Sequence, residues 1–169
     1  MLTAGILVIS DKGWLGERYD ESGQVARECI TGLSIQVNEY AIVPDEREII
    51  SDKLKEWADK SGLALIVTSG GTGLSPRDVT PEATLEVIDR NVPGLAEAMR
   101  IETMKTKPEA ILSRAVVGIR GKCLIINLPG SPKGVRECLD VILPVLTHAL
   151  EILGGKIFEG EHCSEHNAH

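Results

Sequence analysis

LALIVTSGGTGLSPRDVTPEATLEVIDR, residues 63–90, contains an apolar run, a glycine-rich loop and the start of a helix. The continuous apolar run at residues 63–69 is typical of a strand that is buried on both faces of a sheet. Thr80 and Pro81 predict the N-cap and the first turn of the helix that follows. A strand, a loop and a helix in this order favour an α/β fold with parallel strands.

The same alternation of strands and helices continues on both sides of this stretch. Further strands are expected at residues 4–10 and 34–43, and a pair of strands joined at residues 120–122. Helices are expected at residues 22–32 with Ser22 as N-cap, 45–62, 80–90, 95–105 and 131–153, the last one interrupted or kinked at Pro144. The fold prediction is a three-layer α/β/α sandwich with a mostly parallel central sheet and an antiparallel strand pair.

The composition excludes several classes of function. The chain has 169 residues, 43% of them apolar, and no apolar run near the roughly 18 residues of a membrane span, so we expect a soluble protein with no membrane partner. The N-terminus lacks a basic leader, which predicts a cytoplasmic location. The 18 lysines and arginines and 25 aspartates and glutamates give a net charge of −7, which disfavours nucleic acid as a partner.

The length fits a single domain, expected at residues 1–155, followed by a polar, flexible C-terminal tail at residues 156–169. The four cysteines lack C-x-x-C spacing and are expected to be reduced thiols that act as small core residues. A soft-metal site is the alternative to a frayed terminus for four residues of the tail: His162, Cys163, His166 and His169.

In open α/β sheets, ligands bind at the carboxyl ends of the strands. The loops expected there are residues 10–22, 69–78 and 127–133. In the middle one, Gly70, Gly71 and Gly73 carry no Cβ atoms, so backbone amides can approach a phosphate closely. The spacing matches neither a dinucleotide fingerprint nor a P-loop, and a simple tight turn remains the alternative.

The third loop, NLPGSPKG, repeats this pattern at the end of another strand. Gly130 closes the turn, Ser131 and Pro132 are suited to the N-cap and first turn of a helix, and Lys133 supplies a cation. An ordinary capped helix is the alternative interpretation. Two such loops in one sheet together favour a shared anion pocket.

Asp45 and Asp78 both lie between a strand and a helix. Carboxylates disfavour an anion unless a cation such as Mg²⁺ bridges them to phosphates. Asp45 has an alternative role as a helix cap, because Glu48 follows it in the spacing of a capping box. Asp78 has an alternative role as a turn residue.

GGTG at residues 70–73, followed after four residues by DVTP at 78–81, resembles the signature of the MogA/MoaB family of molybdenum-cofactor biosynthesis proteins, which includes the G domain of gephyrin. The segments ILVISDKG, VPDE, AILSR and NLPGSPK resemble other elements of that family. Together these similarities cover most of residues 4–153.

The resemblance implies a Mg²⁺-dependent nucleotidyltransferase, a molybdopterin adenylyltransferase that transfers AMP from ATP to the terminal phosphate of molybdopterin and releases pyrophosphate. It also implies a homotrimer or hexamer and a molybdate-insertion enzyme as downstream partner. A phosphate monoester is already largely anionic at neutral pH, so the lack of histidine and cysteine in the three loops agrees with this chemistry. The alternatives are a non-catalytic carrier or scaffold of the MoaB type, and a different reaction on the same fold, as in competence-damage proteins.

Matched position by position, the resemblance makes Asp45 and Asp78 the catalytic residues and the Mg²⁺ ligands. An amide cradle would be formed by Ser69, Gly70, Gly71, Thr72 and Gly73. The pterin and phosphate side would be lined by Ser10, Asp11, Ser113, Arg114, Asn127, Pro129, Gly130 and Ser131. For Ser113 and Arg114, a simple turn before a strand is the alternative.

Overall fold

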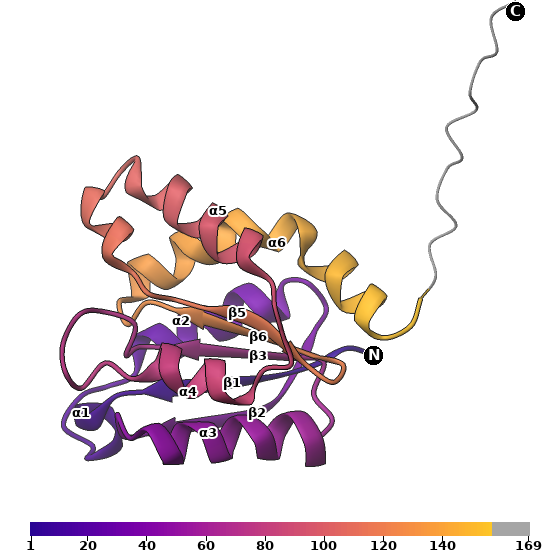
Figure 1. The fold of residues 1–169 in the computed structure, drawn as a ribbon, viewed down its shortest axis with the longest axis horizontal. Helices are drawn as coiled ribbons and strands as arrows, with labels where there is room; N and C mark the ends of the chain where they lie inside the picture. The colour runs from indigo at the N-terminus through magenta and orange to yellow at the C-terminus, as the bar shows by residue number, and fades with distance from the viewer. Residues whose placement is uncertain (157–169) are drawn as a thin grey trace, which may run out of the picture.

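The computed structural model describes residues 1–156, which form a six-stranded sheet with the order β2-β1-β3-β6-β5-β4 (Figure 1). The strands are β1 (Thr3–Ile9), β2 (Gln36–Val43), β3 (Leu65–Ser69), β4 (Arg90–Asn91), β5 (Val117–Arg120) and β6 (Cys123–Leu128). The first four in spatial order are parallel, and β5 is antiparallel to both β6 and β4. The predicted mostly parallel sheet with an antiparallel pair is confirmed.

Helices cover both faces of the sheet and give three layers (Figure 1). One face is covered by α2 (Glu21–Thr31), α5 (Pro93–Met104) and α6 (Pro132–Leu153). The other is covered by α3 (Arg47–Lys55), its π-helical continuation η1 (Glu56–Lys60) and α4 (Thr80–Val87). The predicted α/β/α sandwich is therefore correct.

The continuous apolar strands are explained by this double coverage. Leu65 and Val67 pack into the cluster beneath α2, α5 and α6, whereas Ile66 between them packs into the cluster beneath α3 and α4. Alternate side chains of a strand point to opposite faces, so both sets must be apolar. The described cysteines, Cys29, Cys123 and Cys138, are buried and unbridged, as expected.

The start of α2 differs from the prediction. Its N-cap is Asp20 and not Ser22, because the Asp20 carboxylate accepts a hydrogen bond of 2.8 Å from the amide of Gly23. The Ser22 hydroxyl instead donates to the same carboxylate, at 3.3 Å. The predicted cap was therefore two residues late.

The start of α4 also differs. The N-cap is Val79, and Thr80 is already helical. The Thr80 hydroxyl does not cap the helix, because it donates to the carbonyl of Gly70 at 2.9 Å. The residue chosen as a cap thus connects the helix to the glycine-rich loop.

Three short elements were not predicted: α1 (Asp11–Trp14), the 3₁₀ helix η2 (Pro108–Leu112) and the two-residue β4. Of the two predicted effects of Pro144, the interruption is absent, since α6 continues through Pro144 as one helix, and the kink stays a prediction. The predicted N-cap of α6, Ser131, is confirmed. Within residues 1–156, no helix is both long and apolar enough to cross a membrane. The cysteine and histidines of the predicted tail lie outside the described residues.

Candidate functional site

The parallel strands β1, β2, β3 and β6 deliver their loops to the same edge of the sheet, where α1 also lies (Figure 1). The loop after β3 has positive φ angles at Gly70 (105°) and Gly71 (69°), which side chains rarely tolerate. A Cβ on Gly70 would lie 2.2 Å from the carbonyl oxygen of Ile9. These two glycines are therefore required by the backbone path of the loop.

The glycine-rich loop is fixed to its neighbours on two sides. Thr80 donates from its amide to the Gly71 carbonyl at 3.1 Å and from its hydroxyl to the Gly70 carbonyl. The Ser69 hydroxyl donates to the Pro129 carbonyl at 2.9 Å, which ties the loop after β3 to the loop after β6. The two predicted anion loops are thus adjacent and mutually braced.

Asp45 does not cap α3, so the capping interpretation is wrong. The N-cap position is Glu46, and its side chain makes no capping bond. The Asp45 carboxylate accepts a hydrogen bond from the Asp11 amide instead. Burial raises the pKa of the Asp45 carboxyl, and the carboxylates of Asp11 and Asp78 raise it further, although the amide of Asp11 opposes the rise.

Arg77 connects three loops of the site. Its guanidinium donates to both carboxylate oxygens of Asp11, at 3.1 and 2.9 Å, and to Glu46 at 3.1 Å. The hydrogen bonds from Arg77 hold the pKa of Asp11 below its ordinary value. Asp11 lines neither of the two cavities described below and serves as a link between Arg77 and Asp45.

Asp78 is held beside the glycine-rich loop. Its Oδ2 accepts a hydrogen bond of 3.0 Å from the Ser75 amide, and it would lie 2.8 Å from a Cβ on Gly73. Arg114 donates to the carbonyls of Gly73 and Asp78 at 2.8 and 2.7 Å and pairs with Glu82. Arg114, predicted as a ligand-side residue, lines neither cavity and instead holds this loop against α4.

A cavity of about 650 Å³ lies at this edge of the sheet. We call it the acidic cavity, because its charged lining side chains are Asp20, Glu21, Asp45, Asp78 and a single cation, Arg18. The predicted site residues that line it are Ser10, Asp45, Ser69, Gly70, Gly71, Asp78, Gly130 and Ser131. Residues 18–22 form another part of the lining; they belong to the predicted ligand loop at residues 10–22, but none of them was singled out as a site residue.

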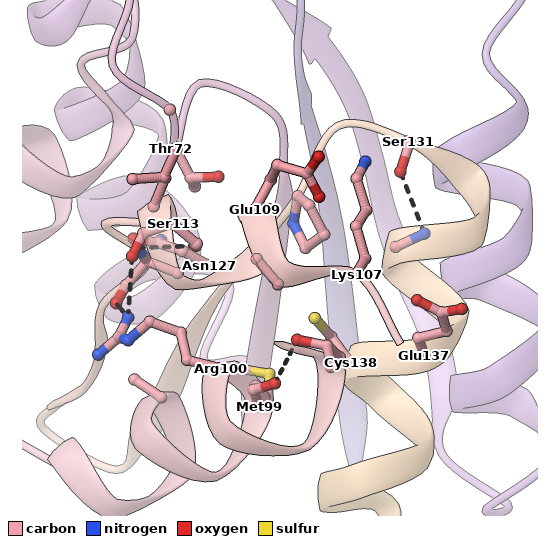
Figure 2. Close-up of a pocket in the computed structure, with 18 of the residues that line it drawn as sticks. Thr72, Met99, Arg100, Lys107, Glu109, Ser113, Asn127, Ser131, Glu137 and Cys138 are labelled. Atoms are coloured by element: carbon pink, nitrogen blue, oxygen red, sulfur yellow. Dashed lines mark hydrogen bonds between the residues drawn. The ribbon is translucent and has the colours of Figure 1, made fainter. Parts of the chain in front are cut away.

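A second cavity of about 450 Å³ lies beside the first, and we call it the ring cavity (Figure 2). The predicted site residues that line it are Thr72, Gly73, Ser113, Asn127, Pro129 and Ser131. Figure 2 shows it between the segment carrying Lys107 and Glu109 and the helix carrying Glu137 and Cys138. Ser131 lines both cavities, so the predicted single pocket is two adjoining ones.

Asn127 has a role that the sequence did not indicate. Its side chain is fully buried, donates to the hydroxyls of Thr68 and Thr84 at 3.1 and 2.9 Å, and accepts from the amide of Val116 at 3.1 Å. These bonds fix β6 to β3, to α4 and to the segment before β5. The Asn127 amide group is therefore committed to the fold.

The donor set suits a cation that is shared with a substrate. Within residues 1–156, no group of three or more histidine, cysteine, aspartate or glutamate side chains is placed to hold a metal ion. Asp45 and Asp78 meet the requirement of Mg²⁺, which typically binds through one or two carboxylates, waters and substrate phosphates. The raised pKa of Asp45 marks a carboxylate that a nearby cation would stabilise in its charged form.

Comparisons with known proteins agree with this geometry. A family model described as "Probable molybdopterin binding domain" matches residues 5–148. The molybdopterin adenylyltransferase of Helicobacter pylori is 41% identical over 157 residues, covering 92% of this chain and 89% of that protein. The molybdenum cofactor synthesis protein cinnamon of Drosophila melanogaster is 43% identical over 92% of this chain, which spans only 26% of cinnamon.

A crystal structure of the molybdopterin biosynthesis enzyme MoaB from Thermus thermophilus is similar throughout. It superposes with a TM-score of 0.88 at 55% identity, covering 92% of this chain and 98% of that one. The similarity therefore extends over most of this chain and nearly all of that one.

Proposed function

Because the chain belongs to the MogA/MoaB family of molybdopterin-binding proteins, we propose that it is a molybdopterin adenylyltransferase. In this reaction, an oxygen of the terminal phosphate of molybdopterin forms a bond to the α-phosphorus of ATP. The bond between the α-phosphorus and the bridging oxygen breaks, and pyrophosphate leaves. The product is adenylylated molybdopterin.

The observation that carries this proposal is the convergence of Asp45 and Asp78 on the glycine-rich loop. The Asp45 carboxylate lies 3.3 Å from the position that a Cβ on Gly71 would take. The Asp78 carboxylate lies 2.8 Å from the corresponding position on Gly73. Two acidic residues at a loop suited to phosphates call for a cation between them.

The residues of the chain act by position and charge. The attacking phosphate is already anionic and needs no general base, so orientation and charge neutralisation are the main requirements. Asp45 and Asp78 would hold Mg²⁺, which neutralises phosphate charge when bound. The amides of the glycine-rich loop and the N-terminus of α6, where Ser131 lines the acidic cavity, would orient phosphate oxygens.

The two cavities fit two substrates that meet at their phosphates. The acidic cavity lies at Asp45 and Asp78 and suits the reacting phosphates. The ring cavity has apolar walls that include Met99 and Leu112 and suits a planar ring. Ser113 and Pro129, which the resemblance places on the pterin side, line the ring cavity, so we assign the pterin ring of molybdopterin to it.

The test is an incubation of the purified chain with molybdopterin, ATP and Mg²⁺, followed by measurement of pyrophosphate and of the adenylylated pterin. We expect both products in equal amounts, and none when ATP is omitted. Tight binding of molybdopterin without pyrophosphate release would overturn the enzyme and support the alternative, a carrier or scaffold of the MoaB type.

We also propose a cytoplasmic homotrimer, or a hexamer made of two such trimers, that passes its product to a molybdate-insertion enzyme. Exposed apolar side chains on α5 and η2 support association between copies; they are Ile101, Met104, Ile111 and Leu112. The match to part of the longer protein cinnamon is consistent with a second activity downstream. Sedimentation that finds only a monomer at micromolar concentration would contradict the trimer.

A further inference from the structure

Arg18 is the only cationic side chain among the described residues that line the acidic cavity. The remaining charged groups there are carboxylates, and the whole chain carries a net charge of −7. A phosphorylated substrate therefore approaches a surface of its own sign. Within a distance of about 10 Å, a local cation influences such a substrate more than remote charges do, because salt screens the latter.

The guanidinium of Arg18 has no protein partner within residues 1–156. Arg77, Arg100 and Arg114, the other arginines near the two cavities, are engaged by carboxylates or carbonyls. Arg18 thus keeps its N–H donors available, and their planar arrangement matches two oxygens of a phosphate. Arg18 is exposed, and its position in the lining of the acidic cavity distinguishes it from other exposed arginines such as Arg90.

The backbone on both sides of Arg18 is held in place. Before it, the Glu17 amide donates to the Lys12 carbonyl at 2.9 Å. After it, the Asp20 carboxylate caps α2 and accepts a short hydrogen bond from the Tyr40 hydroxyl. The cost of ordering on ligand binding is therefore largely confined to the Arg18 side chain itself.

We propose that Arg18 is a substrate-contacting residue that binds phosphate oxygens in the acidic cavity. Asp45 and Asp78 repel these oxygens unless a cation lies between them, and the loop amides supply donors without a full charge. Arg18 supplies the positive charge that these groups lack. The inference rests on the proposed function for the source of the phosphates, which is the triphosphate of ATP or the monoester of molybdopterin.

The test compares four proteins by titration calorimetry in the presence of Mg²⁺: wild type, Arg18→Ala, Arg18→Lys and Arg90→Ala. Arg90 is the matched control, because it is an exposed arginine on β4 that lines neither cavity and its loss changes the net charge equally. ATP and molybdopterin are titrated separately, and urea unfolding checks that each variant is folded.

We expect Arg18→Ala to lower the affinity for at least one of the two ligands by about ten- to a hundredfold, the usual effect of losing a charged hydrogen bond. A lower affinity for ATP alone would place the contact on the triphosphate, and a lower affinity for molybdopterin alone would place it on the monoester. Arg18→Lys should recover part of the affinity, because it keeps the charge but not the planar fork. Arg90→Ala should bind as the wild type does.

Unchanged affinity of Arg18→Ala for both ligands would overturn the inference, as would equal losses in Arg18→Ala and Arg90→Ala or a wild type that binds neither ligand. The proposed function is judged separately, by pyrophosphate release from the wild type. A wild type that binds ATP through Arg18 but releases no pyrophosphate would refute adenylyl transfer and leave the Arg18 contact standing.

Discussion

Asp11 and Asp45, which follow different strands, each accept a hydrogen bond from the other's backbone amide. The amide of Asp11 donates to Asp45 Oδ2 at 2.9 Å, and the amide of Asp45 donates to Asp11 Oδ1 at 3.0 Å. This reciprocal pair joins the loops after β1 and β2 and sets the direction of the Asp45 carboxylate. Asp45 Oδ1 stays available on the side of Gly71.

Asp45→Asn should abolish most of the adenylylation while preserving the fold. The amide oxygen of asparagine can still accept from Asp11, but a neutral amide cannot replace a carboxylate as a ligand of Mg²⁺. We expect turnover to fall by orders of magnitude and molybdopterin binding to persist. Asp78→Asn should behave in the same way. Near-normal turnover by folded Asp45→Asn at saturating Mg²⁺ would leave Asp78 as the sole catalytic carboxylate.

The stability of Asp45→Asn should depend on pH in a defined direction. Burial raises the folded-state pKa of Asp45, so the folded protein binds the proton more tightly than the unfolded chain does. The wild type therefore loses stability as the pH rises from the unfolded pKa through the folded pKa, and the loss persists above it. Urea unfolding without Mg²⁺ should therefore show the free energy of unfolding of Asp45→Asn rising relative to that of the wild type between about pH 3 and pH 7. The change should be less than about 1 kcal/mol, because the Asp45 carboxylate is only half-buried.

Arg77→Ala should lower activity more than stability. Arg77 acts on Asp45 through Asp11, and its ion pairs are exposed, so the stability cost should be below about 1 kcal/mol. Loss of the link frees the Asp11 carboxylate, and we expect turnover to fall about tenfold with little change in the KM for ATP. Arg47→Ala, which removes an exposed pair with Glu86 on α3 and α4, is the control and should remain fully active.

The central strands β1, β3 and β6 could be predicted because helices cover both faces of the sheet there, so nearly every residue of these strands is buried and the sequence shows an apolar run. The cap of α2 was missed for a local reason: Asp20 and Ser22 are both suited to an N-cap, and their spacing does not decide between them. The role of Thr80 could not be predicted because it depends on a partner in another segment, the carbonyl of Gly70, ten residues earlier. Local spacing identifies a residue that can cap a helix, but only the fold determines which acceptor its hydroxyl reaches.

The site shows the same division. The glycine-rich loop and the acidic residues were identifiable because their chemistry is unusual for a strand-to-helix connection. Asn127 and Arg114 also lie in segments that resemble the family, but their side chains form hydrogen bonds within the fold. No sequence pattern distinguishes a polar side chain that binds a ligand from one that binds the backbone. The ring cavity depends on how η2 packs against α5 and faces α6 across the cavity, which residues 108–112 alone do not reveal.

Asn127→Ala should therefore act as a stability variant. The substitution leaves the hydroxyls of Thr68 and Thr84 and the amide of Val116 without their partner in a buried region. Loss of such bonds costs about 1–3 kcal/mol each when a polar group is stranded, so the urea midpoint should drop clearly. If the variant keeps its stability but loses most of its affinity for molybdopterin, Asn127 is a substrate-binding residue, as the resemblance implied.

Gly71→Ala tests whether the glycine-rich loop is built for close approach. Gly71 has a φ of +69°, and a Cβ there would lie 2.3 Å from the hydroxyl oxygen of Thr80, the group that holds the Gly70 carbonyl. Gly121→Ala is the control, since Gly121 has a φ of +57° and no atom within 4 Å of the Cβ position. Backbone strain alone should cost Gly121→Ala about 1 kcal/mol, whereas overpacking should bring Gly71→Ala to about 2–4 kcal/mol. The displaced loop should also lose most of its affinity for ATP, and equal stability losses in the two variants would mean that Thr80 yields easily and does not brace the site.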